Sequence, residues 1–275
     1  MTTTEPRRYV RRHFDHSLPF KIRELYQYRS LLWTLSASEL KLRYRRSVLG
    51  FLWTLLNPLL MMIVLSAVFS TIMRFDIKNY SVLLLSGLLP WTFFVQSVTG
   101  SLMSIVGKEA LIKKVYLPKA VIPLSSVVSN FVNFSLSLLP FIVLTAALSH
   151  PITHHLIYLP LAMLLLAVFT AGVSFLFSCL NVYFRDFGHM TEVLIQAWFY
   201  LSPIIYTLEI IPERYRAPFM YNPMYYFIEC FRGPIYYNRS PDTQILAIAT
   251  GSALIAFLLG FFIFTKYERN FVLRV

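Results

Sequence analysis

Charged side chains are scarce in this chain of 275 residues. Asp, Glu, Lys and Arg make up 14% of the sequence, whereas a soluble domain usually carries about 25%. From Ala120 to Phe184, none of the four occurs over 65 residues. A soluble core would not bury so much apolar side chain, so the deficit argues against a soluble domain and predicts a membrane protein.

Cysteine and metal-binding patterns are also nearly absent. The two cysteines, Cys179 and Cys230, have neither metal-site nor redox spacing, and we expect both to be small apolar core residues. The adjacent His154 and His155 are only a weak indication of a metal site. No Ser-His-Asp pattern and no paired carboxylates within a span stand out. The chain is therefore expected to hold no metal, and no catalytic pattern indicates an enzyme.

A phosphate-binding loop is missing as well. Gly107 and Lys108 form a Gly-Lys pair, but a Walker motif needs a glycine five residues before that pair's glycine and Ser or Thr after the lysine. Those positions hold Leu102 and Glu109. The apolar runs contain no acid or base apart from Glu192, which argues against ion coupling. A pump of this kind would take its energy from another chain.

What the sequence does contain is a series of long apolar runs. One transmembrane helix needs about 20 such residues. Because the runs are continuous rather than alternating, they predict helices and not a β-barrel. We expect an all-α integral membrane protein with six transmembrane helices, two of them within 120–184. The stretches are 47–73, 79–107, 120–184, 187–208 with Glu192 tolerated, and 243–265.

The positive charges predict an orientation. With a cytoplasmic N-terminus, six spans place 19 of the 25 Lys and Arg on the cytoplasmic side and 6 on the other. The positive-inside rule therefore predicts that both termini are cytoplasmic. The net charge of +12 fits contact with anionic membrane lipids, and no motif indicates nucleic-acid binding.

The N-terminal part divides into two segments before the transmembrane domain, which we place at 47–275. Residues 1–19 are expected to be flexible and basic. Residues 20–46 predict an amphipathic helix at the cytoplasmic membrane surface. Within it, Ser36 to Glu39 reads as a capping box that starts a helix.

The region 211–242, between the expected spans five and six, is apolar and aromatic but contains five prolines. It also carries Glu229 and Arg232. Irregular backbone at membrane depth survives only when protein or an aqueous cavity surrounds it. We expect re-entrant helices entering from the outer face; an interfacial aromatic belt is the alternative.

One adjacent pair of opposite charges, Arg185 and Asp186, ends the uncharged run. We place it in a short cytoplasmic turn between spans four and five. There Arg185 can extend to water and Asp186 can cap the next helix. A structural role is sufficient to explain the pair, and a docking role is the functional alternative.

Aromatic residues gather near the expected outer halves of the spans. They can stack on sugar rings and offer hydroxyl groups, or they can form the ordinary interfacial belt. The set comprises Trp91, Phe93, Phe94, Trp198, Phe199, Tyr200, Tyr206, Tyr221, Tyr225, Tyr226, Tyr236 and Tyr237.

Five sequence landmarks in order resemble the membrane subunits of ATP-binding-cassette polysaccharide exporters, in the branch that exports O-antigen and wall teichoic acid. The resemblance covers about residues 25 to 270. The landmarks are RYRRSVLGFLWTLLNPLL (43–60), SGLLPWTFFVQS (86–97), LNVYFRDFGH (180–189), LSPIIYTLEIIP (201–212) and YNPMYY (221–226).

The resemblance implies that two copies of this chain pair with two copies of a cytoplasmic ATPase, which would bind ATP and Mg²⁺. A lipid-linked polysaccharide with a polyprenyl diphosphate anchor would cross the bacterial inner or plasma membrane, with 211–242 as an outer gate and the aromatic set along the path. The expected ATPase contacts are Lys108, Glu109, Lys113, Lys114, Tyr116, Leu117, Arg185 and Asp186. The expected diphosphate contacts are Arg43, Arg45 and Arg46.

Two other function classes remain open from the sequence. A membrane-embedded transferase acting on polyprenyl-linked sugars would need catalytic carboxylates or metal ligands near one face. An ion-coupled secondary transporter would work without any ATPase. Each predicts a chain that functions without a nucleotide-binding partner.

Overall fold

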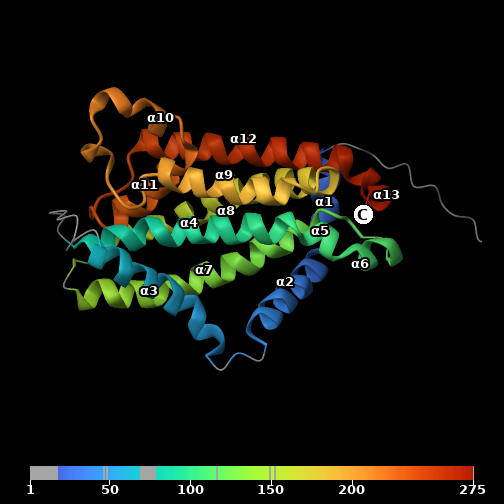
Figure 1. Cartoon of the computed structure of the whole chain (residues 1–275), viewed down its shortest axis with the longest axis horizontal. Coiled ribbons are helices and arrows are strands. Elements are labelled where there is room, and N and C mark those ends of the chain that lie inside the picture. Colours follow the sequence, from blue (N-terminus) through green and yellow to red (C-terminus); the bar gives the residue numbers. More distant parts are fainter. Residues whose placement is uncertain are drawn as a thin grey trace, which may run out of the picture.

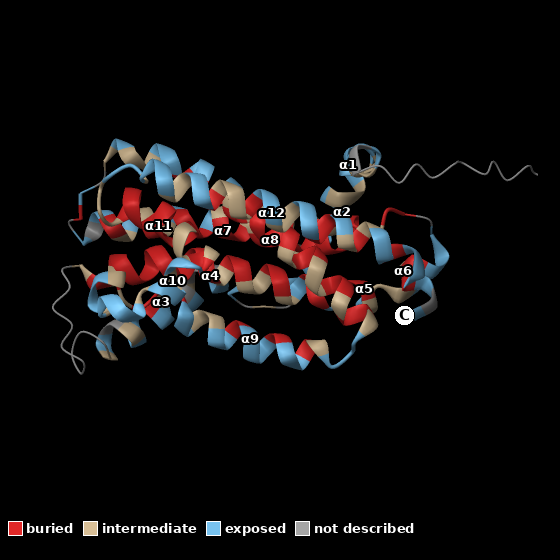
Figure 2. Cartoon of the chain, turned by 90° about the horizontal axis from the view of Figure 1, so that it is seen from above, coloured by how far each residue is buried: buried red, intermediate tan, exposed pale blue. Residues whose placement is uncertain are grey.

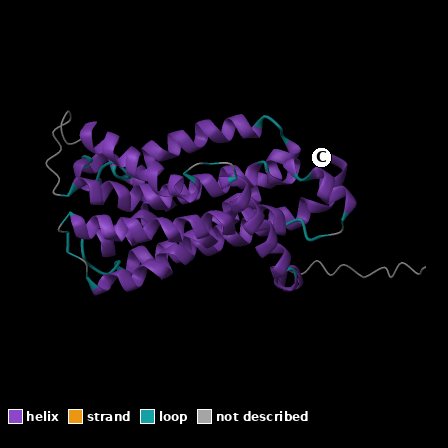
Figure 3. Ribbon diagram, turned by 90° about the horizontal axis from the view of Figure 1, so that it is seen from below, coloured by secondary structure: helices purple, strands orange, loops and turns teal. Residues whose placement is uncertain are grey.

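The structure is a computed structural model that describes residues 18–45, 47, 49–68, 79–115, 117–148, 150–151 and 153–274. Helices are the only regular elements in these residues, and no strand occurs among them (Figure 3). The prediction of an all-α chain is confirmed. The segment expected at 1–19 falls almost entirely outside the described residues, as do Arg46 and Tyr116.

Four helices are long and apolar enough to cross a membrane: α4 (Tyr80–Leu102), α7 (Val121–Ala147), α8 (Leu159–Tyr183) and α12 (Thr243–Tyr267). At a rise of about 1.5 Å per residue they extend roughly 35–40 Å, more than the hydrocarbon core requires. They lie alongside one another in Figure 1. The long uncharged run forms α7 and α8, as predicted.

The helix α4 occupies the centre of the bundle. In the most apolar 18-residue stretch of α4, 78% of the stretch is buried inside the protein, compared with 22% for the corresponding stretch of α12. It packs against α7, α8 and α11 (Pro223–Ile235). A helix that is apolar on all sides belongs in such a central position, whereas α12 leaves most of its surface for lipid.

The helices α8 and α12 approach so closely that their backbones touch where Gly172 crosses Gly260. A Cβ atom added to Gly172 would lie 2.3 Å from the carbonyl carbon of Ala256. One added to Gly260 would lie 2.0 Å from the carbonyl oxygen of Gly172. Small residues permit this close packing between membrane helices, where lipid gives no hydrophobic drive for association.

Two further helices flank α4 but are shorter. These are α3 (Trp53–Ser66, 14 residues), preceded by the 3₁₀ turn η1 (Gly50–Leu52), and α9 (Phe187–Leu201, 15 residues). Helices of that length rise only about 21–23 Å, less than the bilayer core. Figure 2 shows that most of α9 is exposed. The described residues thus contain four helices that are long and apolar enough to span a membrane, and the count of six stays a prediction.

The single helix expected over 20–46 is two helices, α1 (Leu18–Gln27) and α2 (Arg29–Tyr44), with Tyr28 between them. Arg29 donates a hydrogen bond to the carbonyl oxygen of Tyr26 at 3.4 Å, which satisfies one acceptor at the end of α1.

The expected helix start at Ser36 is wrong, because α2 runs through it. The Ser36 hydroxyl donates back to the carbonyl oxygen of Leu32 at 2.8 Å and also lies 3.1 Å from that of Ser125 on α7. A contact with another helix therefore replaces the predicted cap.

The region after α9 consists of short helices. These are η4 (Leu208–Ile210), η5 (Glu213–Tyr215), α10 (Ala217–Met220) and α11. Asn222 begins α11 by accepting a hydrogen bond from the Met224 backbone N–H. The helix α11 packs against α4, α8 and α12. The predicted interruption by prolines is confirmed, and the re-entrant path through a membrane stays a prediction.

Candidate functional site

One end of the bundle carries most of the predicted contact residues, and we call it the basic end. It gathers α1, α2, α5 (Ser104–Gly107), α6 (Glu109–Lys114), the turn 184–186, η6 (Glu268–Asn270) and α13 (Phe271–Arg274). Figure 1 shows these elements at the right, while α10 and α11 lie at the opposite end. Segments far apart in the sequence thus share one surface.

Lys108 connects the loop after α4 to α2. Its ammonium lies 2.5 Å from a carboxylate oxygen of Glu39, and both side chains are largely buried. The same oxygen accepts a hydrogen bond from the Ser125 hydroxyl at 3.0 Å. Lys108 therefore holds α2 against α7 and the loop, so it is not free to bind a partner through its charge.

We expect Glu39→Gln to lower the free energy of unfolding by about 1 kcal/mol, because Lys108 loses a partly buried counter-charge. The matched control is Glu109→Gln, which removes a carboxylate from an exposed pair with Lys113 and should change stability little. Thermal unfolding of the purified protein in detergent checks both variants. Equal shifts would contradict a special role for Glu39.

The helix α6 presents its lysines outward. Lys113 pairs with Glu109 one turn earlier, and Lys114 is exposed. Leu117 is buried, so it packs inside the protein instead of projecting toward a partner. The helix α6 ends at Lys114, before Pro118.

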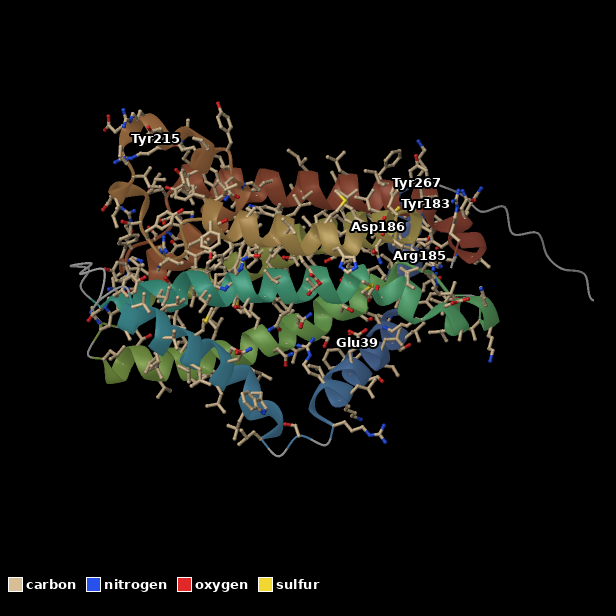
Figure 4. The ribbon with its side chains drawn as sticks, viewed as in Figure 1. Glu39, Tyr183, Arg185, Asp186, Tyr215 and Tyr267 are labelled. Carbon is tan, nitrogen blue, oxygen red and sulfur yellow. The ribbon has the colours of Figure 1, made fainter. Side chains whose placement is uncertain are left out.

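The charged pair that ends the uncharged run lies in the turn between α8 and α9. Arg185 and Asp186 are both exposed, and Figure 4 shows them at the basic end near Tyr183 and Tyr267. Asp186 occupies the N-cap position of α9, but its side chain makes no capping hydrogen bond. The predicted turn is confirmed. The prediction that the Asp186 side chain caps α9 is wrong, because that side chain accepts no hydrogen bond from the helix.

The C-terminal segment completes the basic end. Lys21 on α1 pairs with Glu268 at 2.6 Å, and the Lys119 ammonium donates to the Glu268 carbonyl oxygen at 2.5 Å. Phe271 is fully buried beneath them. A pocket of about 450 Å³ opens among these elements. Sequence reasoning missed this assembly, since its partners are distant in the chain.

Electrostatic effects at this pocket differ between its two lysines. Burial acts to lower the pKa of Lys21, but the hydrogen bond and charge of Glu268 and the charge of Glu24 raise it overall. For Lys119, burial lowers the pKa, and the charge of Lys21 lowers it further. The charge of Glu268 acts in the opposite direction but does not outweigh burial. Lys21 is thus the more firmly charged partner of Glu268.

Among the predicted diphosphate contacts, Arg43 has a defined environment. Its guanidinium donates to the side-chain oxygen of Asn130 at 2.8 Å and to that of Gln96 at 3.4 Å. It lines a pocket of about 230 Å³ between α2, α3, α4 and α7, which we call the Arg43 pocket. Arg45 is exposed at the end of α2.

A larger pocket of about 500 Å³ lies between α3, α4 and α9, and we call it the α9 pocket. Its walls combine amides and one carboxylate with aromatic rings. Asn57, Thr92 and Gln96 line both this pocket and the Arg43 pocket, so the two are neighbours. The residues that line the α9 pocket are Asn57, Met61, Leu88, Trp91, Thr92, Val95, Gln96, Glu192, Ile195, Gln196, Phe199 and Tyr200.

The predicted path aromatics of α4 and α9 separate into three groups. Phe94 is fully buried and packs on Trp198 with ring centroids 5.1 Å apart, so it serves the core of the bundle. Trp91, Phe199 and Tyr200 line the α9 pocket. Phe93 lines the Arg43 pocket and stacks on a neighbouring ring of α7.

The predicted tyrosines lie at the opposite end. Tyr206 donates to the carbonyl oxygen of Tyr200 at 2.6 Å, and Tyr226 to that of Met220 at 2.8 Å. The rings of Tyr225 and Tyr226 are in contact, whereas Tyr221 is 88% exposed. Tyr206 and Tyr226 hold local loop structure, and Tyr221 is available for contacts outside the chain.

A buried cation stabilises this end. Arg232 on α11 is fully buried, donates to the carbonyl oxygen of Ile204 at 2.8 Å, and lies 3.5 Å from Glu229. It thereby ties the loop after α9 to α11. The sequence identified both charged residues but did not show that they pair.

His150 joins three loops at the same end. Its Nδ1 lies 3.0 Å from the amide nitrogen of Asn79, and its Nε2 lies 3.0 Å from the carbonyl oxygen of Ile235 and 3.2 Å from the Asn238 amide nitrogen. Both asparagines adopt left-handed backbone conformations, with φ of 53° and 52°. The geometry describes a structural junction.

Sequence reasoning missed the polar residues of the pockets. Asn57, Gln96, Asn130 and Gln196 stand within apolar runs, which was the one signal available for them, and Glu192 was noted as an acid but not as a pocket residue. No group of three or more His, Cys, Asp or Glu side chains that could hold a metal occurs in the part of the chain the structure describes.

Comparison with known proteins gives a consistent result. Residues 30–236 match the family model described as ABC-2 type transporter. The chain is 39% identical to the O-antigen export system permease protein RfbA of Myxococcus xanthus over 237 residues, 85% of this chain and 91% of the relative. It is 35% identical to the protein of the same name in Klebsiella pneumoniae over 244 residues, 88% and 93% of the two chains.

A more distant similarity extends over nearly the same length. The polysialic acid transport protein KpsM of Escherichia coli is 26% identical over 241 residues, 84% of this chain and 90% of the relative. The family match covers α2 through α11 and leaves out α1 and α12.

Proposed function

This chain belongs to the ABC-2 type transporter family, and from that membership we propose that it is the membrane subunit of an ATP-driven exporter. Its cargo would be a lipid-linked polysaccharide of the O-antigen or teichoic acid type, moved outward across a bacterial inner or plasma membrane. The chain itself is a permease subunit and an integral membrane protein. ATP and Mg²⁺ would be bound by a separate ATPase, present in two copies.

The basic end supports a cytoplasmic docking surface, and this observation carries the proposal. Arg185 and Asp186 are exposed there, and α6, which carries the exposed Lys114, lies at the same end with α1 and the C-terminal segment. The positive-inside rule assigns this end to the cytoplasm, with both termini inside. An ATPase bound there would transmit its closure directly to α4, α8 and α9.

Polar residues at membrane depth support a homodimer. Asn57 on α3 and Glu192 and Gln196 on α9 are exposed in the single chain. A carboxylate and amides on a helix surface are unfavourable against lipid and favour a protein partner or water. A second copy facing α3 and α9 would enclose them, and α3 and α9 would then complete six spans.

The two pockets would give the substrate a place to enter. The short helices at the opposite end would form a gate. The guanidinium fork of Arg43, held by Asn130 and Gln96, suits a diphosphate, with Arg45 nearby in sequence. The short helices of 211–242 would form a re-entrant outer gate. The tie between Arg232 and Ile204 would hold that gate to the end of α9.

The experiment that tests the proposal is purification of the tagged chain from its own membranes in a gentle detergent, followed by mass spectrometry. We expect a phosphate-loop ATPase at a near one-to-one ratio. A stable, homogeneous chain without any ATPase would contradict the exporter and favour a transferase or secondary transporter.

The docking surface can be tested by charge reversal. We expect Lys113→Glu combined with Lys114→Glu to weaken ATPase association by about tenfold, since rim charges of the wrong sign oppose docking. The control is Arg214→Glu, an exposed charge at the opposite end. Binding of purified ATPase to the variant in nanodiscs measures the effect. An undiminished affinity would remove α6 from the interface.

A further inference from the structure

Glu192 is an acid in an unusual position. It lines the α9 pocket, and it makes no ion pair among the described residues. It lies roughly 8 Å along the helix axis from Phe187, where α9 begins. An isolated carboxylate at that depth is costly unless water, protein groups or a ligand form hydrogen bonds with it.

The lining of the α9 pocket contains no Lys, Arg or His. His189, three residues before Glu192 on the same helix, is the nearest titratable group along α9, and it does not line the pocket. The remaining polar groups are the amides of Asn57, Gln96 and Gln196 and the hydroxyls of Thr92 and Tyr200. Among the described residues, Glu192 is therefore the one formal charge on this lining, and a cation, Arg43, lies behind Gln96 with its guanidinium 3.4 Å from the Gln96 side-chain oxygen. Apolar walls reduce the screening of the Glu192 charge toward a ligand in the pocket.

We propose that the α9 pocket binds uncharged sugar residues and that Glu192 is a specificity-determining residue that disfavours anionic glycans. This inference rests on the proposed exporter function and narrows its cargo. It selects a neutral glycan over a polyphosphate chain of the teichoic acid type. The same reasoning applies to glycans whose sugars carry carboxylates.

The chemistry of the pocket matches a sugar ring. A carboxylate accepts hydrogen bonds from two hydroxyl groups, and such charge-assisted bonds are stronger than neutral ones. Amides on the facing helices both donate and accept. Phe199, which is half-buried, offers a flat apolar surface for the C–H face of the ring, and the buried Trp91 packs against it with ring centroids 5.7 Å apart. A sugar carboxylate or phosphate would instead place a like charge against Glu192.

The neighbouring Arg43 pocket has the opposite charge. Because the two pockets share Asn57, Thr92 and Gln96, a ligand with an anionic and a neutral part can occupy both at once. The diphosphate of a lipid-linked glycan would lie at Arg43, and the sugars that follow it would lie at Glu192. The charge difference between the walls thus orients the substrate as well as selecting it.

The test uses two glycans that differ only in charge. An oligogalacturonate and the galactose oligomer obtained by reducing its carboxyl groups share linkage and ring stereochemistry. Calorimetric titration of each into the purified complex of the chain with its co-purified ATPase gives the two affinities. We expect the neutral oligomer to bind at least about tenfold more tightly than the anionic one.

The variant Glu192→Gln keeps the size of the side chain and removes its charge. We expect it to reduce the preference to about threefold or less, mainly by tighter binding of the anionic oligomer. The matched control is Glu213→Gln, which removes an acid whose side chain is 91% exposed at the opposite end. The control should leave the preference unchanged.

The outcomes separate the two proposals. Failure of the neutral oligomer to bind, equal binding of both oligomers, or an unaltered preference in Glu192→Gln overturns the assignment of Glu192 and leaves the exporter standing. Absence of any ATPase from the purified material overturns the exporter itself, whichever sugar binds.

Discussion

Gly260→Leu should yield almost no folded protein. A Cβ at this position would lie 2.0 Å from the carbonyl oxygen of Gly172, and the obstacle is backbone that no rotamer change can move. The helices α8 and α12 would have to separate along their main contact. We expect the free energy of unfolding to fall by more than about 3 kcal/mol, which is above the usual cost of overpacking.

Gly251→Leu is the matched control, since it lies on the same helix and a Cβ there meets nothing within 4 Å. Gly172→Leu should reproduce the defect, and the double variant should be little worse than either single one, because both break the same contact. Size-exclusion chromatography in detergent measures the folded yield. A normal yield of Gly260→Leu would show that α8 and α12 do not cross as described.

Arg232→Met should destabilise the protein by about 3–5 kcal/mol, the range for breaking a buried ion pair by removing one partner. Methionine fills much of the same space, but it leaves Glu229 buried without its counter-charge. It also removes the donor to the Ile204 carbonyl oxygen. Both losses fall on the loop that joins α9 to the short helices.

Thermal unfolding in detergent reports the change, and Arg214→Met, at an exposed cation of the same region, serves as the control. The double variant Arg232→Met with Glu229→Gln should recover part of the stability, since no uncompensated charge remains. If the single and double variants unfold at the same temperature, the charge pairing is not the source of the stability.

The sequence was most informative where local composition decides structure. An uncharged run of 65 residues was long enough for two spans, and α7 and α8 fill it. Two adjacent charges marked the turn between α8 and α9. In a lipid environment, long apolar runs and their charged ends constrain the chain more strongly than propensities do in water.

Prediction from the sequence failed where contacts with distant residues determine the local structure. Ser36 looked like a helix start, but its hydroxyl bonds back within α2 and meets Ser125, which lies 89 positions away. Lys108 pairs with Glu39, which lies 69 positions away, and no sequence pattern indicated that pair. No local pattern reports a contact between separate helices.

For the same reason, only part of the candidate site could be predicted from the sequence. The aromatic residues could be named from the sequence, but the sequence could not separate the buried Phe94 from Tyr200 on the pocket wall. Asn57, Gln96 and Glu192 lie in three different apolar runs. Only the packing of α3 and α9 beside α4 brings them to one pocket.

The contact between Lys21 and Glu268 sets an order for biosynthesis. The two residues are 247 positions apart, so the ribosome must have made nearly the whole chain before they can meet. Until then α1 lacks its partner, and Phe271 has not filled its place beneath Lys119. Closing contacts of such long range is slow compared with forming the helices themselves. The docking surface that we propose at the basic end would therefore be finished last, and a growing chain still in the insertion machinery would not yet present it to a partner.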